Sequence, residues 1–424
     1  MQVTIPYGEK TLPLILPDWL EVTVLQPHQT PPAPDQAAAV QEAIDKVDWE
    51  QFAGVRTAAI AINDKTRPVP NHLLLPPLLR KLQEIGIERD KITLIIATGN
   101  HKPMMPNEFD KILPGEIYAN YRVISHDVDA DHNIIRLGMT THRTVVSINR
   151  AFFEANLRIA VGNVEPHQFV GYSGGVKSAV IGLAGMDTIN GNHRMMVEPL
   201  AQLGRYEDNP VRQDIEEMGR IVGVHLALNS VLNDKKEIVW VFCGPPVAVM
   251  HAAIPLVRQV YELPVARPFD LVIASPGGYP KDINIYQAQK ALGHAAPITR
   301  VGGTVILAAA CTESSGSAKY EYWLSMMQLH FGADPNRAII DRFKAEGFRV
   351  GPHKAYQIAR DSVDRRVLWV TDLPNPAQFA LHGMPSLRAA LTYALDADPT
   401  IRHVGIMPYA NATIPVLAHP QKDN

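Results

Sequence analysis

Runs of apolar residues that continue without alternation recur along the chain. They are separated by stretches in which apolar residues return every three or four positions. In the first half the uninterrupted runs cover residues 56–62, 92–97 and 157–164, which is typical of strands buried on both faces. Helical spacing covers 35–47 and 73–85. This alternation predicts an α/β fold with a mainly parallel sheet.

The second half of the chain repeats the pattern after a break. Residues 226–232 and 238–242 have the composition of strands, and prolines then interrupt the pattern over 263–268. Strand-like runs resume beyond the break, at 271–274, 304–310, 367–371 and 402–408.

This organisation predicts two α/β domains with mainly parallel sheets and an active site in the cleft between them. We expect an N-terminal domain over 1–265 and a C-terminal domain over 268–400. The tail, 401–424, is a candidate for packing back on the N-terminal domain.

Polar residues follow the first two buried runs. Residues 63–68 contain Asp64 and Arg67, and residues 98–101 end in His101. Because the carboxyl ends of parallel strands lie at one edge of a sheet, we expect these two clusters to meet in one cleft.

Composition excludes several classes of function. The 424 residues carry a formal net charge of −3 and no basic stripe, so nucleic acid is not an expected partner. The apolar runs are too short to span a bilayer, and residues 1–10 lack the pattern of a secretory signal. Cys243 and Cys311 are too few and too far apart for a disulfide framework. A cytoplasmic protein is therefore expected.

The stretch 165–178 concentrates chemistry-bearing residue types directly after a buried run. It holds His167, Ser173, Lys177 and several glycines. Glycines at the end of a strand let the backbone approach an anion, and a lysine supplies a mobile charge or an amine.

Two familiar motifs fit this stretch poorly. A phosphate-binding P-loop would need glycine at Val176. A nucleophile elbow centred on Ser173 would need its strand to run almost directly into the serine, but residues 165–170, with a proline, intervene. A nucleoside-triphosphatase and a serine hydrolase are both disfavoured.

Taken singly, the candidate residues also have purely structural explanations. His193 could cap a helix, Lys177 could be solvated, and Asp64 with Arg67 could stabilise a turn. No H-E-x-x-H or C-x-x-C motif is present, so a zinc site built from protein ligands alone is not supported. We assign the histidines outside the motifs to structure or surface: His126, His132, His142, His225 and His353.

An ordered set of short motifs resembles the nickel-pincer nucleotide-dependent lactate racemase family. The set consists of residues 97–103 (Ala-Thr-Gly-Asn-His-Lys-Pro), 165–177, 191–193 (Gly-Asn-His) and 286–290 (Tyr-Gln-Ala-Gln-Lys). One motif alone would be weak, but the four occur in the family's order and the resemblance extends over most of the chain.

The resemblance implies an isomerase that racemises or epimerises a 2-hydroxy acid by reversible hydride transfer. His101 and His167 match the two histidines that alternate as acid and base. The hydride acceptor of the family is a nickel-pincer nucleotide (pyridinium-3-thioamide-5-thiocarboxylic acid mononucleotide). Lys177 matches its covalent tether, and His193 matches the nickel ligand. Its phosphate would be bound by backbone groups of Ser173, Gly174 and Gly175.

The resemblance also implies a substrate site and partners. Tyr286, Gln287 and Lys290 match positions that hold the substrate carboxylate, and we expect Asp64 to orient a catalytic histidine and Arg67 to stabilise an oxyanion. The family includes enzymes for several 2-hydroxy acids, so the substrate is lactate or a related acid. Cofactor-making enzymes are expected as transient partners, and the sequence is compatible with a homodimer.

Two alternatives remain. An NAD-dependent 2-hydroxy acid dehydrogenase would need a G-x-G-x-x-G turn after a strand, and Gly302-Gly303 instead precede their expected strand. A non-catalytic nucleotide-binding protein of the same fold would bind the nucleotide without exchanging hydrogen at C2 of the substrate.

Overall fold

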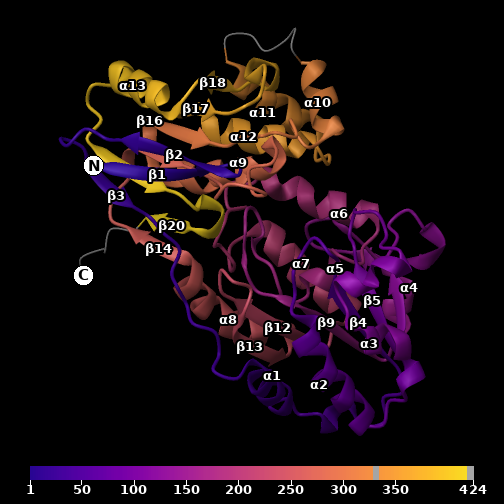
Figure 1. Cartoon of the computed structure of the whole chain (residues 1–424). Coiled ribbons are helices and arrows are strands. Elements are labelled where there is room, and N and C mark those ends of the chain that lie inside the picture. Colours follow the sequence, from indigo (N-terminus) through magenta and orange to yellow (C-terminus); the bar gives the residue numbers. More distant parts are fainter. Residues whose placement is uncertain (328–333, 418–424) are drawn as a thin grey trace, which may run out of the picture. The chain divides into compact units, whose positions relative to one another are not determined.

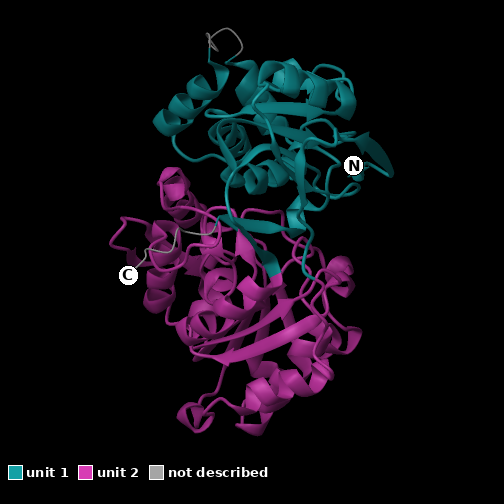
Figure 2. Ribbon diagram, turned by 90° about the vertical axis from the view of Figure 1, so that its left-hand side faces the viewer, with its two compact units in different colours: residues 1–28, 261–424 teal, residues 29–260 magenta. Residues whose placement is uncertain are grey.

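The chain forms two compact units, which a computed structural model describes over residues 1–327 and 334–417 (Figures 1 and 2). Unit 1 combines Met1–His28 with the chain from Tyr261 onward, and unit 2 is Gln29–Val260. Both are mixed α/β units, as the sequence predicts. Within the described ranges no helix has the length and apolar character needed to cross a bilayer.

A six-stranded sheet forms the centre of unit 2. Its strand order is β13-β12-β9-β4-β5-β6, and all neighbours run parallel except β13, which is antiparallel to β12. The strands are β4 (Ala58–Asn63), β5 (Ile92–Ala97), β6 (Arg122–Ser125), β9 (Leu157–Asn163), β12 (Leu226–Leu232) and β13 (Ile238–Gly244).

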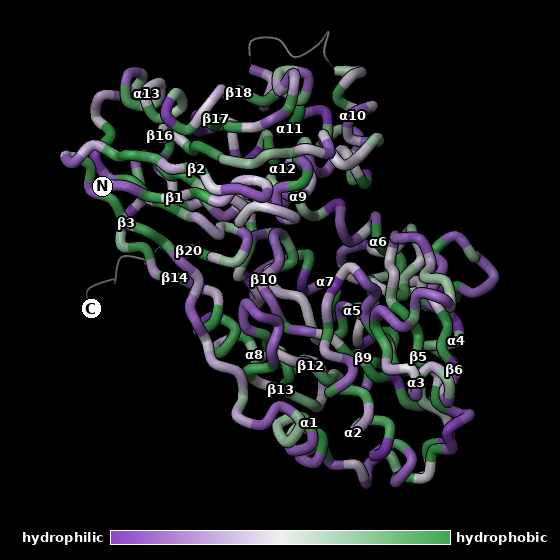
Figure 3. Tube along the Cα trace, in the orientation of Figure 1, coloured by the Kyte–Doolittle hydropathy of each residue, from purple (hydrophilic) through white to green (hydrophobic). Residues whose placement is uncertain are grey.

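Helices and short hairpins complete unit 2. Helices α1 and α2 contribute apolar side chains to one core with β4, β5, β9 and β12, whereas α5 contacts β4 and β9 and also packs on α7. Figure 3 shows the strands of this sheet as largely hydrophobic segments. The helices are α1 (Gln36–Asp45), α2 (Asn71–Glu84), α3 (Gly115–Asn120), α4 (Arg150–Glu154), α5 (Lys177–Val180), α6 (Met186–His193), α7 (Pro210–Val222) and α8 (Pro246–Tyr261). The hairpins pair β7 (Ile134–Met139) with β8 (Val145–Asn149), and β10 (Pro166–His167) with β11 (Gly171–Tyr172).

Unit 1 is built on a second six-stranded sheet, in which every neighbouring pair is parallel. The order is β18-β17-β16-β15-β19-β3. The strands are β3 (Glu21–Val24), β15 (Phe269–Ala274), β16 (Thr299–Ala308), β17 (Arg366–Val370), β18 (His382–Met384) and β19 (His403–Met407).

Further elements of unit 1 surround this sheet. The N-terminal hairpin of β1 (Gln2–Tyr7) and β2 (Lys10–Ile15) buries Ile5 and Leu14 in the core that the sheet shares with α13. Strand β14 (Glu262–Val265) pairs with β20 (Ile414–Leu417). The helices are α9 (Ile285–Ala295), α10 (Ala318–Ser325), α11 (Pro335–Glu346), α12 (Pro352–Ser362) and α13 (Leu387–Ala397).

The structure differs from the expected domains at both ends of the chain, residues 1–28 and residues 401–417. The first 28 residues belong to unit 1, because β3 pairs with β19 and the β1–β2 hairpin packs in the unit 1 core. The tail does not join the N-terminal domain, since β19 is an inner strand of the unit 1 sheet. Residues 418–424 lie outside the described part of the chain. Pairings this distant in sequence leave no local pattern to read.

The core packing of unit 2 generates a stability prediction. Leu78 in α2 is fully buried, so Leu78→Ala should lower the free energy of unfolding of unit 2 by about 2–5 kcal/mol. Leu200→Ala, at a side chain that is 40% exposed, should change it by less than about 0.5 kcal/mol. Urea titration followed by hydrogen exchange in peptides from unit 2 measures both values. Equal effects of the two substitutions would contradict this account of the core.

Candidate active site

The candidate residues of unit 2 lie at the carboxyl edge of its parallel sheet. Strands β4 and β5 are in register to their last residues, with Asn63 opposite Ala97, so the segments that follow them leave the sheet at the same level. Oδ2 of Asp64 lies 2.7 Å from Nδ1 of His101, as expected for two clusters at one edge. Strand β9, next to β4, leads into the glycine-rich segment 165–176.

Asp64 and His101 form an oriented pair. The Asp64 carboxylate is buried and also accepts hydrogen bonds from the amide and hydroxyl of Thr66, whereas the His101 side chain is half exposed. Burial alone would raise the pKa of Asp64, but the hydrogen bonds from His101 and Thr66 outweigh it and hold the pKa below its usual value. An ionised carboxylate only accepts, so Nδ1 of His101 carries a proton and Nε2 is the ring nitrogen left to face a substrate.

The Ser173 hydroxyl closes the glycine-rich segment on itself. It contacts the carbonyl oxygens of Asn163 and Glu165 at 3.0 and 3.1 Å, and it accepts the Glu165 amide. The Ser173 amide donates to the Glu165 carbonyl at 2.8 Å. The serine therefore holds the turn in shape, which agrees with the weak fit to a nucleophile elbow.

Glycine is required at positions 174 and 175. Their φ angles are +84° and +58°, and a Cβ on Gly174 would lie 2.7 Å from a methyl group of Val164. The Gly175 amide donates to Oδ1 of Asn229 at 2.7 Å. Of the three predicted phosphate-binding residues, Ser173 and Gly175 thus already have internal acceptors for their amides. A phosphate would use Gly174 or displace those acceptors.

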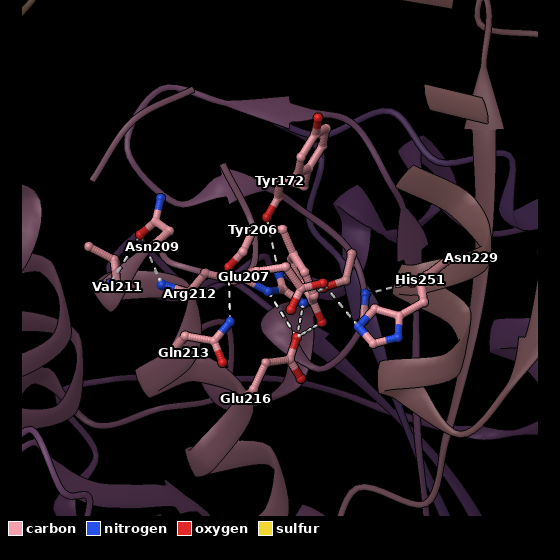
Figure 4. A network of polar contacts seen from close by, with 12 residues as sticks. Tyr172, Tyr206, Glu207, Asn209, Val211, Arg212, Gln213, Glu216, Asn229 and His251 are labelled. Carbon is pink, nitrogen blue, oxygen red and sulfur yellow. Dashed lines mark hydrogen bonds and ion pairs between the residues drawn. The ribbon is translucent and has the colours of Figure 1, made fainter. Parts of the chain in front are cut away.

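Arg212, a buried residue that the sequence analysis did not select, donates hydrogen bonds to the backbone of this segment. Nη1 of Arg212, in α7, donates to the carbonyl oxygens of Tyr172 and Gly174 at 3.0 and 3.2 Å. Its Nε donates to Glu216 at 2.9 Å, and the Tyr206 hydroxyl donates to the same carboxylate oxygen (Figure 4). The one signal in the sequence is an arginine on the buried face of an amphipathic helix with a glutamate four residues later.

Lys177 begins α5 directly after the glycines, and its side chain is buried. Burial lowers the pKa of this amine well below its usual range, and the positive charges of Arg67 and Arg212 lower it further, against a smaller opposing effect of Glu165. These surroundings favour the neutral form of the Lys177 amine, which is the nucleophilic form.

Two histidines flank one aromatic ring beside this lysine. The Phe169 ring meets His167 and His193 edge to face, with ring centroids 4.9 and 5.1 Å apart. Burial lowers the pKa of His193 to about 3, helped by the positive charge that Lys177 carries when it is protonated and by that of Arg67. His193 is thus a neutral imidazole at physiological pH, the form that binds metals.

The predicted substrate residues Tyr286, Gln287 and Lys290 lie in the first turns of α9 in unit 1. The helix start is held by loop 311–317, whose Ser314 and Ser315 carbonyl oxygens accept the amides of residues 285 and 286 at 3.0 Å. Nζ of Lys290 donates to Oε1 of Gln287 at 2.8 Å.

Two residues of α12 that the sequence reasoning did not select lie against Tyr286. Nζ of the buried Lys354 is 4.7 Å from the centroid of the Tyr286 ring, and the His353 ring meets it edge to face at 5.8 Å. His353 had been assigned to structure or surface. Only a prediction of how α12 packs on α9 could have selected this pair, since neither residue belongs to a motif.

Comparisons with known proteins decide the family. The model of the lactate racemase N-terminal domain matches residues 7–204, and that of the lactate racemase C-terminal domain matches residues 265–408. The chain belongs to the lactate racemase family. It is an isomerase of the racemase type.

Individual relatives agree with this assignment. The chain is 30% identical over 336 residues to lactate racemase from Lactiplantibacillus plantarum, a match that covers 78% of this chain and 77% of that one. It is 28% identical over 382 residues to lactate racemase from Thermoanaerobacterium thermosaccharolyticum, which covers 88% of each chain.

Solved structures show the same fold. The lactate racemase apoprotein from T. thermosaccharolyticum superposes with a TM-score of 0.87 and 26% identity, covering 98% of this chain and all of that one. A crystal structure of a Thermotoga maritima protein gives a TM-score of 0.64 at 17% identity, over 90% and 97% of the two chains, and shows the likeness of fold alone.

The residues of unit 2 fit the nickel-containing cofactor that lactate racemases use. A buried amine with a lowered pKa at Lys177 would suit a covalent tether, and a neutral imidazole at His193 would suit a nickel ligand. Among the described residues no three His, Cys, Asp or Glu side chains gather into a metal-binding group.

The Asp64–His101 pair generates a prediction about pH. Because the pKa of Asp64 is lower in the folded chain than its unfolded value of about 3.9, ionised Asp64 stabilises the fold above that pH, and the contribution is lost as the pH falls through the folded pKa. Asp64→Asn should therefore lower the free energy of unfolding at pH 6 and have a smaller effect at pH 3.5, which lies below the unfolded pKa. Urea unfolding at both pH values tests this, with the exposed Asp129→Asn as control. An equal effect of Asp64→Asn at both pH values would contradict the assignment.

Proposed function

We propose that this protein racemises lactate or a related 2-hydroxy acid with a nickel-pincer nucleotide tethered to Lys177. The observation that carries the proposal is the buried Lys177 amine at the start of α5, whose pKa is lowered by burial and by the charges of Arg67 and Arg212. Lys177 is close enough to His193 for its charge to affect the pKa of that ring. It follows β9 along the chain, and the neighbouring strand β4 leads to Asp64, which is hydrogen-bonded to His101.

The reaction requires the hydrogen at C2 of the substrate to leave and to return on the other face. As a proton this hydrogen is very weakly acidic, because the adjacent carboxylate is already negative. It leaves more readily as hydride when the hydroxyl proton is removed at the same time. The bound cofactor supplies the hydride acceptor, and the planar 2-keto acid can take hydride back on either face.

In the proposed mechanism His101 and His167 accept and donate the proton of the substrate hydroxyl. Nε2 of His101 accepts the proton from one enantiomer, while Asp64 keeps Nδ1 protonated and the ring oriented. His167 does the same for the opposite enantiomer, with its ring packed against Phe169. When hydride returns to the 2-keto acid, the substrate oxygen becomes an alkoxide and needs a proton. That proton comes either from the histidine that took it up or from the other histidine.

Cationic and polar groups bind the substrate in this proposal. Arg67 faces the developing oxyanion, and its charge also helps to keep Lys177 and His193 neutral. The assignment gives the substrate carboxylate to Lys290 and Gln287, whose side chains are hydrogen-bonded to each other, and to the Tyr286 hydroxyl.

The tether assignment is tested by intact mass and nickel content after exposure to the cofactor-making enzymes. The wild type should gain a nucleotide-sized adduct and nickel in equimolar amount, and Lys177→Ala should gain neither because it lacks the amine. Lys235→Ala, at an exposed turn between β12 and β13, is the control and should load like the wild type. An adduct with nickel on Lys177→Ala would refute the tether. A wild type that loads neither would refute the proposed function.

The two histidines are tested in the loaded enzyme. His101→Gln and His167→Gln should each slow racemisation by about 10²–10⁴-fold, with adduct and nickel unchanged. Because the enantiomers of lactate have equal free energy, kcat/KM should fall equally from L- and from D-lactate. The exposed His142→Gln is the control. Wild-type rates in either histidine variant would exclude that residue as an acid–base group.

A further inference from the structure

A chain of buried polar side chains runs behind His193. Oδ1 of Asn192 lies 3.0 Å from Nδ1 of His193, and Nδ2 of Asn192 donates to Oδ2 of Asp214 at 2.8 Å and to the carbonyl oxygen of Val211 at 3.0 Å. The Thr140 hydroxyl donates to the other oxygen of Asp214. Asn192 and Asp214 are fully buried, and Thr140 nearly so.

The hydrogen-bond chemistry of this chain permits one orientation of the Asn192 amide. Its NH2 group has two hydrogens, and each already meets an acceptor that cannot donate, the Asp214 carboxylate and the Val211 carbonyl. The carbonyl oxygen Oδ1 must therefore face His193. Because Oδ1 only accepts, Nδ1 of His193 must be the protonated nitrogen, and Nε2 must carry the lone pair.

We infer that Asn192 is a positioning residue that fixes His193 in the Nδ1–H tautomer, so that Nε2 is the atom offered to nickel. This rests on the proposed role of His193 as metal ligand. Asp214 and Thr140 act one step further back, by holding the amide of Asn192. Hydrogen bonds of this kind orient metal-binding histidines in many proteins. Here the partner is a neutral amide, so the charge of Asp214 does not contact the ring directly.

The same unit contains a reference histidine with the opposite arrangement. Nε2 of the buried His126 lies 3.0 Å from the Ala184 carbonyl oxygen, so it must donate, and Nδ1 faces Nδ2 of Asn149 at 3.3 Å. Oδ1 of Asn149 accepts the Phe152 amide at the start of α4, which fixes that amide group too. His126 is therefore the Nε2–H tautomer. Each of the two rings has an asparagine partner, and the two amides are turned in opposite senses.

Nitrogen-15 NMR of the protein made without cofactor tests the inference directly. The wild type should show His193 protonated on Nδ1 and His126 protonated on Nε2, with the signals assigned by His193→Gln and His126→Gln. Asn192→Leu, which keeps the side-chain size but removes the acceptor, should lose the Nδ1–H preference of His193. Asn149→Leu should leave His193 unchanged. A wild-type His193 protonated on Nε2 would overturn the inference whether or not any variant folds.

Nickel retention in the loaded enzyme gives a second readout. Asn192→Leu should keep the Lys177 adduct but lose nickel to a chelator about 10–100-fold faster than the wild type or Asn149→Leu. Equal rates of loss in all three proteins would overturn the inference. A wild type that takes up no nickel would instead refute the proposed function, and the NMR measurement on the cofactor-free protein would still decide the tautomer.

Discussion

The site depends on the contact between the buried guanidinium of Arg212 and the backbone of the glycine-rich segment. Carbonyl oxygens that converge at a tight turn repel one another, and the donors of Arg212 hold those of Tyr172 and Gly174 together. A buried arginine is costly without a counter-charge, which Glu216 provides along the same helix. The turn then leads directly into Lys177, so the same arginine both shapes the loop and contributes positive charge beside the amine.

Burial and nearby cations give two residues a common property. Lys177 and His193 could each be protonated at neutral pH in water, yet burial and the charge of Arg67 lower the pKa of both and favour their neutral forms. A neutral amine can form a covalent bond and a neutral imidazole can bind a metal, whereas their protonated forms can do neither. Asp64 shows the opposite balance, because hydrogen bonds keep its carboxylate ionised despite burial. The protonation of Lys177, His193 and Asp64 is therefore influenced by the local surroundings of each side chain. Burial and nearby cations disfavour the charged forms of Lys177 and His193, whereas hydrogen bonds favour the charged form of Asp64.

The sequence predicts features that depend on neighbouring residues in the chain, and it does not predict contacts between distant segments. Continuous apolar runs predict β4, β5 and β9, and the rule that parallel strands share a carboxyl edge predicts that Asp64 and His101 lie close together. Arg212, Asn229 and Lys354 escaped notice because their importance lies in burial beside segments far away in the chain. The pairing of β3 with β19 was missed for the same reason, since nearly four hundred residues separate the partners.

The placement of the first 28 residues in unit 1 has a consequence for synthesis on the ribosome. Unit 2 is one continuous segment, so it can fold as soon as residue 260 has emerged. Strand β3 has no neighbour in its sheet until β19 is made, which at roughly 5–20 residues per second is a delay on the order of tens of seconds. During that interval the backbone groups of β3 lack the strand they pair with. The order of the chain thus places the whole of unit 2 and most of unit 1 between β3 and its neighbour in the sheet.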